Sequence, residues 1–550
     1  MTPALTKVFG PPGTGKTTFI IEEIIKRGIP LGKVAFISFT TKAILEVRAR
    51  IDRDMPTHIT NDDIQFFKTQ HSMNKSLLGV MRDDLVVGEE KMREFAKEQK
   101  VTFSLDFYKK LKNNKYEHAY TEQQEEQSVT REDTIEDEFY YEMQKERIAL
   151  LPSDYVPAHL RHCADVYLRF KRKYFSWMDE HGYIDFNGLI EKGIEEKVVP
   201  NVDLLCVDEW QDMSPLLVKQ INIWTQHIPQ SIHAGDDDQT IFEWAGARPD
   251  DFLKFPTFEC IKEEIILKKT YRLPKNILEL SKRVIARNHN RVRKGAVHAM
   301  KEEEGVLALM HIDQIAEFLK RTMETKSTII LVRCSFIKSK ITDDLIKYDV
   351  PIINIPYSHL IALDIIYRAH KQQYVTQEQL SVLASTSIFP TNVHIAKKKN
   401  KGKTALRKLI DVKNGGDISF ETLREYGVTD KFFYDIEHNI YSNLNIKSLN
   451  KILPLYKKYG SEYKSIKIST IHNQKGSEFD TVIIVSDSTK KISESTRKSL
   501  QKKEEERRVW YTGITRPKEN LIFLDRSFTR YSNHESLIYK EIASYIKYVK

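Results

Sequence analysis

The stretch VFGPPGTGKTTFI, residues 8–20, decides the fold of the first part of this chain. It sets a glycine-rich loop between a short apolar segment, which predicts a strand, and residues 17–27, whose pattern predicts a helix. A second apolar segment, KVAFISFT at residues 33–40, predicts another strand. Because a strand, a loop, a helix and a second strand follow one another, the region is typical of a parallel sheet in an α/β domain.

The glycine-rich loop matches the pattern G-x-x-x-x-G-K-[ST] in the strand–loop–helix context that this pattern requires. Its glycines let successive backbone N–H groups face phosphate oxygens, and the N-terminus of the following helix favours negative charge. We expect Lys16 to reach the β- and γ-phosphates and the Thr17 hydroxyl to hold Mg²⁺. The loop therefore predicts a nucleoside triphosphate site formed by Gly10, Pro11, Pro12, Gly13, Thr14, Gly15, Lys16, Thr17 and Thr18.

A pair of acidic residues ends another apolar segment, VDLLCVDEWQD at residues 202–212. Sheets of α/β proteins present ligands at the carboxyl ends of their strands, so we expect Asp208 and Glu209 beside the phosphates. Asp208 suits a carboxylate near Mg²⁺, and Glu209 suits the group that orients and deprotonates an attacking water. An acidic pair alone is common in turns, and the phosphate loop in the same chain favours the catalytic interpretation.

Two arginines are candidates for stabilising the charge on a transferring phosphoryl group, since a guanidinium can donate two N–H groups to phosphate oxygens. Arg272 lies in LKKTYRLPKNIL and Arg516 lies in VWYTGITRPKENLIF. Taken alone, an arginine near the start of a helix is more typical of a surface ion pair. On these residues alone, both interpretations stay open.

The composition favours a folded, highly charged protein of several domains. A chain of 550 residues is too long for one compact core. Its formal charge of +9 supports a polyanionic partner only if the basic residues cluster, and a scattered charged surface is equally compatible. Four cysteines lie far apart without a CxxC pair, which argues against a zinc site or a disulfide framework and fits a reducing compartment.

The location of the protein is predicted from segments that the sequence lacks. The start, MTPALTKVFG, has no basic segment followed by a long apolar one, and no apolar run reaches the length needed to span a membrane. We therefore expect a cytoplasmic protein with no membrane partner.

The order of segments predicts two α/β cores with parallel sheets, each interrupted by a mainly helical insertion. Apolar segments return at SIHAGDDD, TIILVRC, SIKISTIH and TVIIVSD, and charged segments between them predict helices. The expected domains are a first core at 1–74 plus 181–265, its insertion at 75–180, a second core at 266–365 plus 462–550, and a reduced insertion at 366–461.

Ten segments occur in an order that resembles a known family. They are GPPGTGKTT, ISFTTKA, TQHSM, YIDFNGLI, LLCVDEWQDMS, AGDDDQTIFEWAGA, LKKTYRLPKNIL, TIILVR, STIHNQKGSEFDTVII and VWYTGITRPKENLIF. This set is similar to the motifs of superfamily 1 helicases, specifically the UvrD/Rep/PcrA group, and spans the chain from Gly10 to Phe523. The resemblance implies two RecA-like cores and an ATP-dependent 3′–5′ DNA helicase that uses ATP and Mg²⁺.

The resemblance also implies roles for individual residues. Gln239 would sense the γ-phosphate, and Arg272 and Arg516 would act as arginine fingers from the second core. Tyr271 would stack on the adenine, and Glu478 would meet the ribose hydroxyls. The residues expected to contact DNA are Phe39, Thr41, Lys42, His71, Phe242, Trp244 and His472.

Aromatic side chains suit a path for a single strand, because every base has a π-face and stacking tolerates any sequence. Trp244 is the strongest candidate for stacking, whereas Phe39 and Phe242 are also compatible with a place in a hydrophobic core. The three aspartates Asp236–Asp238 are expected to shape their loop and its hydrogen bonds rather than to carry the metal chemistry.

The sequence departs from the family pattern in three places. The nine residues before Gly10 contain no glutamine motif for reading adenine, which leaves nucleotide selectivity open. Ala245 stands where the family usually has an arginine. The second insertion is shorter than in large members, and its KKKNKGK tract at residues 397–403 suits either a phosphate contact or a flexible surface loop.

The expected function is ATP-driven movement on single-stranded DNA with unwinding of duplex, in replication, repair or recombination. Two alternatives stay open: a DNA-stimulated ATPase that translocates or displaces proteins without unwinding, and an RNA-directed helicase. The expected partners are single-stranded DNA, junctions of single- and double-stranded DNA, and loading, replication or repair proteins. The chain is expected to be a monomer or a weak dimer, and its small size suits a phage or mobile-element protein.

Overall fold

The computed structural model of this protein describes most of the chain outside residues 351–465. The described residues are 2–39, 41–54, 60, 62–81, 83–85, 89–105, 107–108, 134–243, 246–322, 326–348, 350, 365, 374–376, 418–419, 466–525 and 529–548. The chain forms two compact units, Met1–Gly305 with Glu494–Arg516 and Val306–Ser493 with Pro517–Lys550. No helix in the described ranges is both long enough and apolar enough to cross a bilayer.

The first unit is built on a six-stranded sheet in the order β3-β2-β4-β5-β1-β6, and every pairing in it is parallel. The strands are β1 (Ala4–Phe9), β2 (Val34–Ile37), β3 (Phe67–Lys68), β4 (Leu204–Val207), β5 (Gln230–Gly235) and β6 (Ile261–Ile266). The sheet confirms the parallel α/β fold that the sequence predicts. Only β5 separates β1 from β4, so the phosphate loop and the acidic pair follow strands that are near neighbours.

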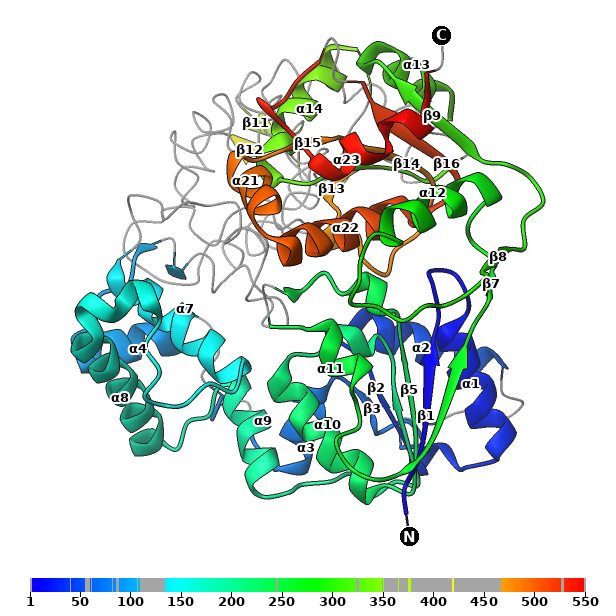
Figure 1. The fold of residues 1–550 in the computed structure, drawn as a ribbon. Coiled ribbons are helices and arrows are strands. Elements are labelled where there is room, and N and C mark those ends of the chain that lie inside the picture. Colours follow the sequence, from blue (N-terminus) through cyan, green and yellow to red (C-terminus); the bar gives the residue numbers. More distant parts are fainter. Residues whose placement is uncertain are drawn as a thin grey trace. The chain divides into compact units, whose positions relative to one another are not determined.

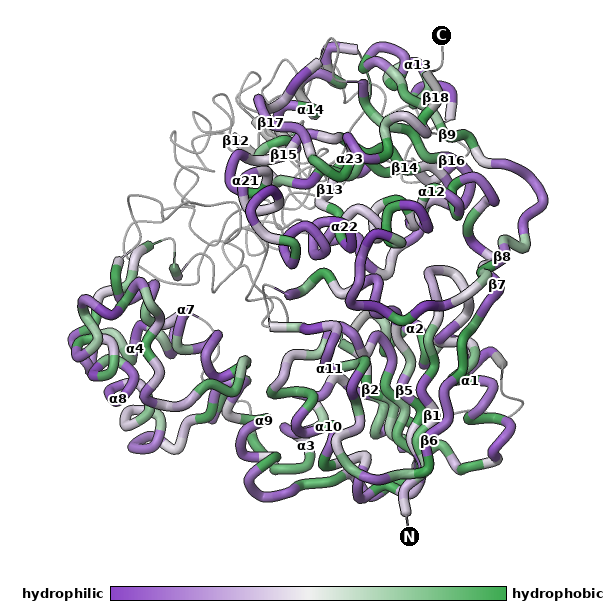
Figure 2. The backbone as a smooth tube through the Cα atoms, in the orientation of Figure 1, coloured by the Kyte–Doolittle hydropathy of each residue, from purple (hydrophilic) through white to green (hydrophobic). Residues whose placement is uncertain are grey.

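Helices cover both faces of this sheet (Figure 1). In β4, Leu204 and Cys206 belong to one buried cluster and Leu205 and Val207 to another, which explains why a strand buried on both faces is apolar throughout. In Figure 2, α1 alternates between hydrophobic and hydrophilic residues, as expected of a helix with one buried face. One cluster includes α1 (Lys16–Arg27) and α2 (Thr41–Asp54), and the other includes α3 (Gln70–Leu77), α9 (Phe186–Glu195), α10 (Pro215–His227) and α11 (Pro249–Leu253).

The carboxyl ends of these strands lie at one edge of the sheet, because all six run in the same direction. Gly10 follows β1, Asp208 follows β4 and Asp236 follows β5. Phe39 comes two residues after the end of β2, and Thr69 directly follows β3. Five of the segments that the sequence singles out therefore begin along one edge of the first unit.

The described part of the predicted first insertion is helical and has its own core. Its elements are α4 (Glu89–Gln99), α7 (Ile135–Ile148), the 3-10 helix η3 (Ala158–Cys163) and α8 (Ala164–His181). Aromatic side chains dominate the buried cluster of these helices, with Phe95 and Trp177 among them. Arg147 of α7 pairs with Asp185 and, at 2.6 Å, with Glu191 of α9, so a buried ion-pair network ties this core to a helix that covers the sheet.

The first unit also contains segments that the sequence analysis assigned to the second core. Strand β7 (Lys269–Thr270), helix α12 (Lys275–Ile285) and strand β8 (His298–Ala299) lie within Met1–Gly305. Helix α22 (Leu500–Ile514) joins them, and Asn288 Nδ2 donates to the Glu504 carbonyl at 2.9 Å. The compact unit thus extends past the predicted boundary at residue 266, because α22 packs both on α12 and on the 3-10 turn η5 (Asp237–Gln239).

The second unit has a separate parallel sheet in the order β13-β10-β14-β16-β9-β18. Every residue of its strand β10 is buried, which confirms the second α/β core. The strands are β9 (Val306–Met310), β10 (Thr328–Val332), β13 (Lys467–Thr470), β14 (Phe479–Ile484), β16 (Pro517–Leu524) and β18 (Lys547–Tyr548), and the helices include α13 (Ile312–Thr322), α14 (Ser335–Lys347) and α23 (Leu537–Ile542).

Several short elements complete the described chain. They are η1 (Leu31–Lys33), η4 (Trp210–Asp212), η8 (His472–Gln474), β15 (Asp487–Ser488), α21 (Lys490–Lys498), β17 (His534–Glu535) and η9 (Ala543–Tyr545). Of the predicted second insertion, only residues 374–376 and 418–419 are described, with strands β11 (Tyr374–Val375) and β12 (Ile418–Ser419). The rest of residues 366–461, including the lysine-rich tract at 397–403, lies outside the described residues.

Lys7 is a buried cation in the middle of β1. Its side chain is 0% exposed, and its Nζ donates to the carbonyl oxygens of Phe252 (2.8 Å), Leu253 (3.2 Å) and Phe255 (3.1 Å). The last carbonyls of a helix have no donors within it, so Lys7 caps the end of α11 from a neighbouring strand. Burial, together with the charge of Lys262, lowers the pKa of Lys7 to about 8.

We expect Lys7→Met to lower the free energy of unfolding of the first unit by about 1–3 kcal/mol, because buried carbonyls lose their donor. The wild type should also gain stability relative to this variant as the pH rises from about 8 towards 10.5. In that window the folded state has lost the proton that the unfolded state still binds, so the unfolding free energy increases with pH.

Urea unfolding followed by tryptophan fluorescence measures both effects, because all five tryptophans belong to the first unit. Other groups that titrate in this window contribute equally to both proteins, so the difference between them isolates Lys7. The same pH dependence in the wild type and in Lys7→Met would contradict the lowered pKa.

Candidate nucleotide and nucleic-acid site

The phosphate loop has a backbone shape that favours glycine. Gly13 and Gly15 have φ values of 74° and 81°, in the left-handed region. A Cβ atom added at Gly13 would also lie only 2.4 Å from the Cβ of Arg272 and 3.0 Å from the Thr270 hydroxyl. The loop therefore packs directly against the segment that carries Tyr271 and Arg272.

Lys16 and Thr17 are the first two residues of helix α1, and both side chains bond to residues around the phosphate loop. The buried Lys16 Nζ donates to the Gly10 carbonyl at 3.0 Å, across the mouth of the loop. The Thr17 hydroxyl donates to Asp208 Oδ2 at 2.6 Å. The loop and the end of β4 are therefore already joined by a short hydrogen bond.

Thr17 and Asp208 fit a magnesium ion. A hydroxyl and a carboxylate are oxygen donors of the kind that Mg²⁺ prefers, and the two side chains already touch. Burial, and next the negative charge of Glu209, raise the pKa of Asp208 to about 6. A divalent cation held here would favour the ionised carboxylate, so the electrostatics of the pair agree with the donor chemistry.

Glu209 has an uncommon backbone conformation at the centre of the site. Its φ is 53°, in the left-handed region that residues other than glycine seldom adopt. Gln211 Nε2 donates to Glu209 Oε2 at 2.5 Å, and Gln211 Oε1 accepts the Asp236 backbone N–H at 2.9 Å. Gln211 thus holds the acidic pair after β4 next to the loop after β5.

Gln239 and Arg516 are brought into direct contact. The Gln239 Nε2 donates to Asp236 Oδ2 at 2.8 Å, and its Oε1 accepts from Arg516 Nη2 at 2.6 Å. Arg516 follows α22 and is almost fully buried. Burial and the nearby charge of Arg272 lower the pKa of Arg516 to about 9, so an anion bound beside these arginines would be stabilised.

The segment after β6 is hydrogen-bonded along the phosphate loop. The Thr270 hydroxyl donates to the Pro12 carbonyl at 2.9 Å, and the Tyr271 N–H donates to the Gly13 carbonyl at 2.9 Å. Tyr271 is 61% exposed, which leaves its ring accessible to a stacked base. Arg272 Nη1 donates to the Thr515 carbonyl at 3.4 Å, next to Arg516.

Glu478 belongs to the second unit, where its carboxylate pairs with Lys518 at 3.0 Å. His472 also belongs to that unit and is buried in η8. The contacts predicted for Glu478 with ribose and for His472 with DNA stay predictions.

Two of the residues predicted to contact DNA stack on one another. The rings of Phe39, after β2, and Phe242, after η5, are 5.6 Å apart at an interplanar angle of 24°. Both are half-buried, so neither belongs to the fully buried core. Phe242 lies three residues beyond Gln239 along the chain, and aromatic side chains are the kind on which bases stack.

The other predicted DNA contacts are only partly described. His71 of α3 lies edge-on to Phe186 at 5.5 Å, and burial lowers its pKa to about 4. It is therefore neutral at pH 7 and suits a hydrogen bond or a stack rather than an ion pair with phosphate. Trp244 and Ala245 lie outside the described residues, as do the side chains of Thr41 and Lys42.

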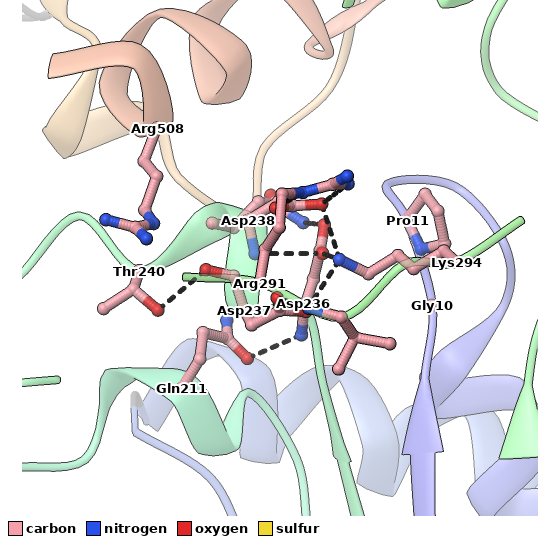
Figure 3. Close-up of polar contacts among 12 residues, drawn as sticks. Gly10, Pro11, Gln211, Asp236, Asp237, Asp238, Thr240, Arg291, Lys294 and Arg508 are labelled. Carbon is pink, nitrogen blue, oxygen red and sulfur yellow. Dashed lines mark hydrogen bonds and ion pairs between the residues drawn. The ribbon is translucent and has the colours of Figure 1, made fainter. Parts of the chain in front are cut away.

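The three aspartates shape their loop, as the sequence predicts, and they do so around a lysine (Figure 3). Asp236 accepts from the Asp238 N–H at 3.3 Å as well as from Gln239. Lys294 Nζ lies 2.9, 2.7 and 2.5 Å from carboxylate oxygens of Asp236, Asp237 and Asp238. The lysine therefore occupies the position that a metal ion would take among three carboxylates.

The chain matches models of two domains of a known protein family. The model of the UvrD/REP helicase N-terminal domain matches residues 4–258, and that of the UvrD-like helicase C-terminal domain matches residues 362–526. The chain belongs to the UvrD/Rep helicase family. The first match contains the phosphate loop, the acidic pair and Gln239, and the second contains Glu478 and Arg516.

Individual relatives agree with this family. The chain is 23% identical to the ATP-dependent DNA helicase Rep of Buchnera aphidicola subsp. Schizaphis graminum, over 64% of this chain and 68% of that protein. It is 23% identical to the ATP-dependent DNA helicase PcrA of Staphylococcus epidermidis, over 96% and 83%. A probable DNA helicase II homologue of Mycoplasma capricolum is 26% identical, over 52% of this chain and 40% of that protein. By family, the enzyme is an ATP-dependent DNA helicase.

Sequence reasoning missed several residues of this helicase that surround the predicted ones. They are Gln211, which joins the two strand ends, Lys294 and Arg291, which bind the aspartates, and Arg508, which pairs with Glu243 at 3.0 Å. Three consecutive carboxylates near a buried strand require cations, and the basic segment NRVRKG at residues 290–295 was an available signal. Which cation meets which carboxylate depends on packing between distant segments.

We expect Glu209→Gln to keep the affinity of the helicase for ATP within about threefold while DNA-stimulated turnover falls by about 10²–10⁴-fold, the usual contribution of a general base. Binding of a fluorescent ATP analogue and steady-state hydrolysis measure the two quantities. Lys16→Ala serves as a comparison, because it should weaken binding as well. If Glu209→Gln loses binding and turnover equally, Glu209 is not the base.

We expect Phe39→Ala and Phe242→Ala each to weaken binding of single-stranded DNA by about 1–3 kcal/mol, because a stacked base loses its platform. Anisotropy of a labelled oligothymidine measures the affinity. Phe258→Ala is the matched control, since this half-buried ring lies before β6, at the opposite edge of the sheet. Unchanged affinity in both variants would assign the stack to internal packing alone.

Proposed function

We propose that this helicase moves 3′ to 5′ along single-stranded DNA and separates duplex ahead of it, and that each step is coupled to hydrolysis of one ATP. The observation that carries the proposal is the stretch from Gln239 to Phe242. Gln239 contacts the buried Arg516, and three residues further on Phe242 stacks on Phe39. A stretch of four residues therefore links a candidate γ-phosphate sensor to a candidate platform for bases.

In this proposal the side chains around the phosphate loop divide the chemistry among them. Lys16 binds the β- and γ-phosphates, and Arg516 and Arg272 stabilise the charge on the transferring phosphoryl group. Glu209 accepts a proton from the attacking water, which Gln239 helps to orient. Thr17 and Asp208 would hold Mg²⁺, which would supply positive charge to neutralise the phosphates.

The conformational step follows from differential binding. A nucleotide changes an equilibrium only if it binds one conformation more tightly than the other. The Gln239–Arg516 hydrogen bond offers such a difference, because the γ-phosphate of ATP would bind the guanidinium that the Gln239 amide holds in place, whereas ADP lacks this phosphate. A rearrangement of Gln239 would then change the Phe39–Phe242 stack and the grip on a base.

Single-stranded DNA and junctions with duplex are the proposed substrates. Stacking on Phe39 and Phe242 requires unpaired bases, and it distinguishes neither sequence nor sugar. Stacking therefore does not decide whether the enzyme selects DNA over RNA. Neither this choice nor the choice of ATP over GTP follows from these contacts, and the assay with tailed duplexes measures both.

Partial duplexes with a 3′ or a 5′ tail test the proposal. We expect strand displacement with ATP on the 3′-tailed duplex, little on the 5′-tailed one, and none with Lys16→Ala, because that variant loses its phosphate contact. A gel assay measures displacement, and GTP and RNA-tailed substrates run in parallel. DNA-stimulated hydrolysis without displacement on either tail would favour the alternative of a translocase that clears proteins without unwinding.

A further inference from the structure

One ammonium group contacts three consecutive buried carboxylates in the first unit. The side chains of Asp236–Asp238 are 0% exposed, and that of Lys294 is 3% exposed. Buried charges are strongly unfavourable without partners, and removing one partner from such a group leaves the others uncompensated. The three carboxylates hold the ammonium strongly enough to raise the pKa of Lys294 well above its usual value despite burial. Lys294 is therefore a permanent cation of this loop.

The contacts of Lys294 continue in one direction to the candidate γ-phosphate sensor. Asp236 uses one oxygen, Oδ1, for Lys294 Nζ at 2.9 Å and the other, Oδ2, for Gln239 Nε2 at 2.8 Å. The two ends of an amide differ, since Nε2 only donates and Oε1 only accepts. Because Asp236 takes the donor end of Gln239, the acceptor end is left to face Arg516 Nη2, at 2.6 Å.

A second cation of the cluster lacks this connection and therefore serves as a comparison. Arg291 binds only one of the three aspartates among its hydrogen bonds, with Nε and Nη2 at 2.7 and 2.5 Å from the two oxygens of Asp238. Lys294 and Arg291 share a segment, a buried anion and a structural role. Of these two cations, Lys294 is the one that also contacts Asp236.

We propose that Lys294 is a positioning residue for ATP turnover, which fixes the Asp236 carboxylate so that Gln239 presents its amide oxygen to Arg516. The proposal rests on the proposed function in that Gln239 and Arg516 are taken to read the γ-phosphate. Without Lys294, the Asp236 carboxylate can turn or take up a proton, and the Gln239 amide can then rotate. The site would still bind the adenine, the ribose and the first two phosphates, and it would lose its response to the third.

Nucleotide discrimination tests this inference independently of unwinding. The probe is the ratio of the dissociation constants for ADP and for a non-hydrolysable ATP analogue, measured in the full chain with Mg²⁺. In Lys294→Met we expect the ratio to fall about tenfold through weaker binding of the ATP analogue, with ADP affinity within twofold of wild type. DNA-stimulated kcat should fall by at least tenfold, with a smaller change in KM.

Two comparisons separate positioning from a merely structural role. Arg291→Met should leave the ratio within twofold of wild type, although it also removes a buried cation from the cluster. In a Gln239→Ala background, Lys294→Met should cause no further loss of the ratio, because the two residues act through the same contact. Equal weakening of ADP and the ATP analogue, a ratio unchanged in Lys294→Met, or additive losses in the double variant would each overturn the inference.

Lys294→Met leaves three buried carboxylates with fewer cations, so a second variant protects the test against misfolding. Lys294→Met/Asp237→Asn removes one positive and one negative charge together, and the asparagine can still accept from the Val292 N–H, which now donates to Asp237 Oδ2 at 2.7 Å. Asp237 is not part of the path from Lys294 through Asp236 to Gln239. The inference requires the double variant to lose discrimination as well, and a wild-type ratio in a folded double variant would contradict it.

The measurements of nucleotide binding and of unwinding together distinguish a failure of the proposed function from a failure of this inference. If the wild type discriminates between the nucleotides and Lys294→Met does not, while no tailed duplex is unwound, the positioning role stands and the unwinding activity does not. If the wild type unwinds duplex but binds ADP and the ATP analogue equally, the role inferred for Lys294 is wrong.

Discussion

The common direction of six strands is the constraint on which the rest of the first unit depends. A parallel sheet gathers the carboxyl ends of its strands at one edge, and β1, β4 and β5 are neighbours in it. Thr17 of the phosphate loop and Asp208 of the acidic pair are 191 residues apart in the sequence, yet a few short side chains connect these segments with each other and with the aspartate loop. Thr17 supplies the first connection with its 2.6 Å hydrogen bond to Asp208, and Gln211 supplies the second, because it bonds Glu209 at 2.5 Å and accepts from the Asp236 N–H at 2.9 Å.

Electrostatics divides the site into parts that are already compensated and parts that are not. Lys294 pairs with all three carboxylates of the aspartate loop, and these carboxylates raise its pKa despite burial. Burial, and next the charge of Glu209, raise the pKa of Asp208 towards neutrality, whereas burial, and next the charge of Arg272, lower the pKa of Arg516. Two like-charged pairs of opposite sign thus flank the phosphate loop, and a metal–triphosphate complex brings a cation for one and an anion for the other. Under the proposed function, the same ligand would relieve both pairs.

Much of this arrangement could be predicted from the sequence, because the signals are local. A glycine-rich loop between a strand and a helix, and an apolar run that ends in Asp208 and Glu209, define their own backbone context. Lys294, Arg291 and Arg508 were not predicted, since each acts on a residue that only packing brings near it. The extent of the first compact unit beyond residue 266 was not predicted for the same reason: α22 is far away in sequence and packs on α12 and η5.

Glu209 has a consequence for how such an enzyme can lose its activity. With φ at 53°, a glutamate holds a conformation that asparagine or glycine adopts more readily, at a cost on the order of 1 kcal/mol. Replacement by glycine or asparagine would relax this turn and also remove the carboxylate, so the folded protein would gain stability as it loses its proposed base. Selection for robustness and selection for turnover therefore oppose one another at a single residue. A lineage released from the need to hydrolyse ATP would be expected to change here early, and to keep its fold while doing so.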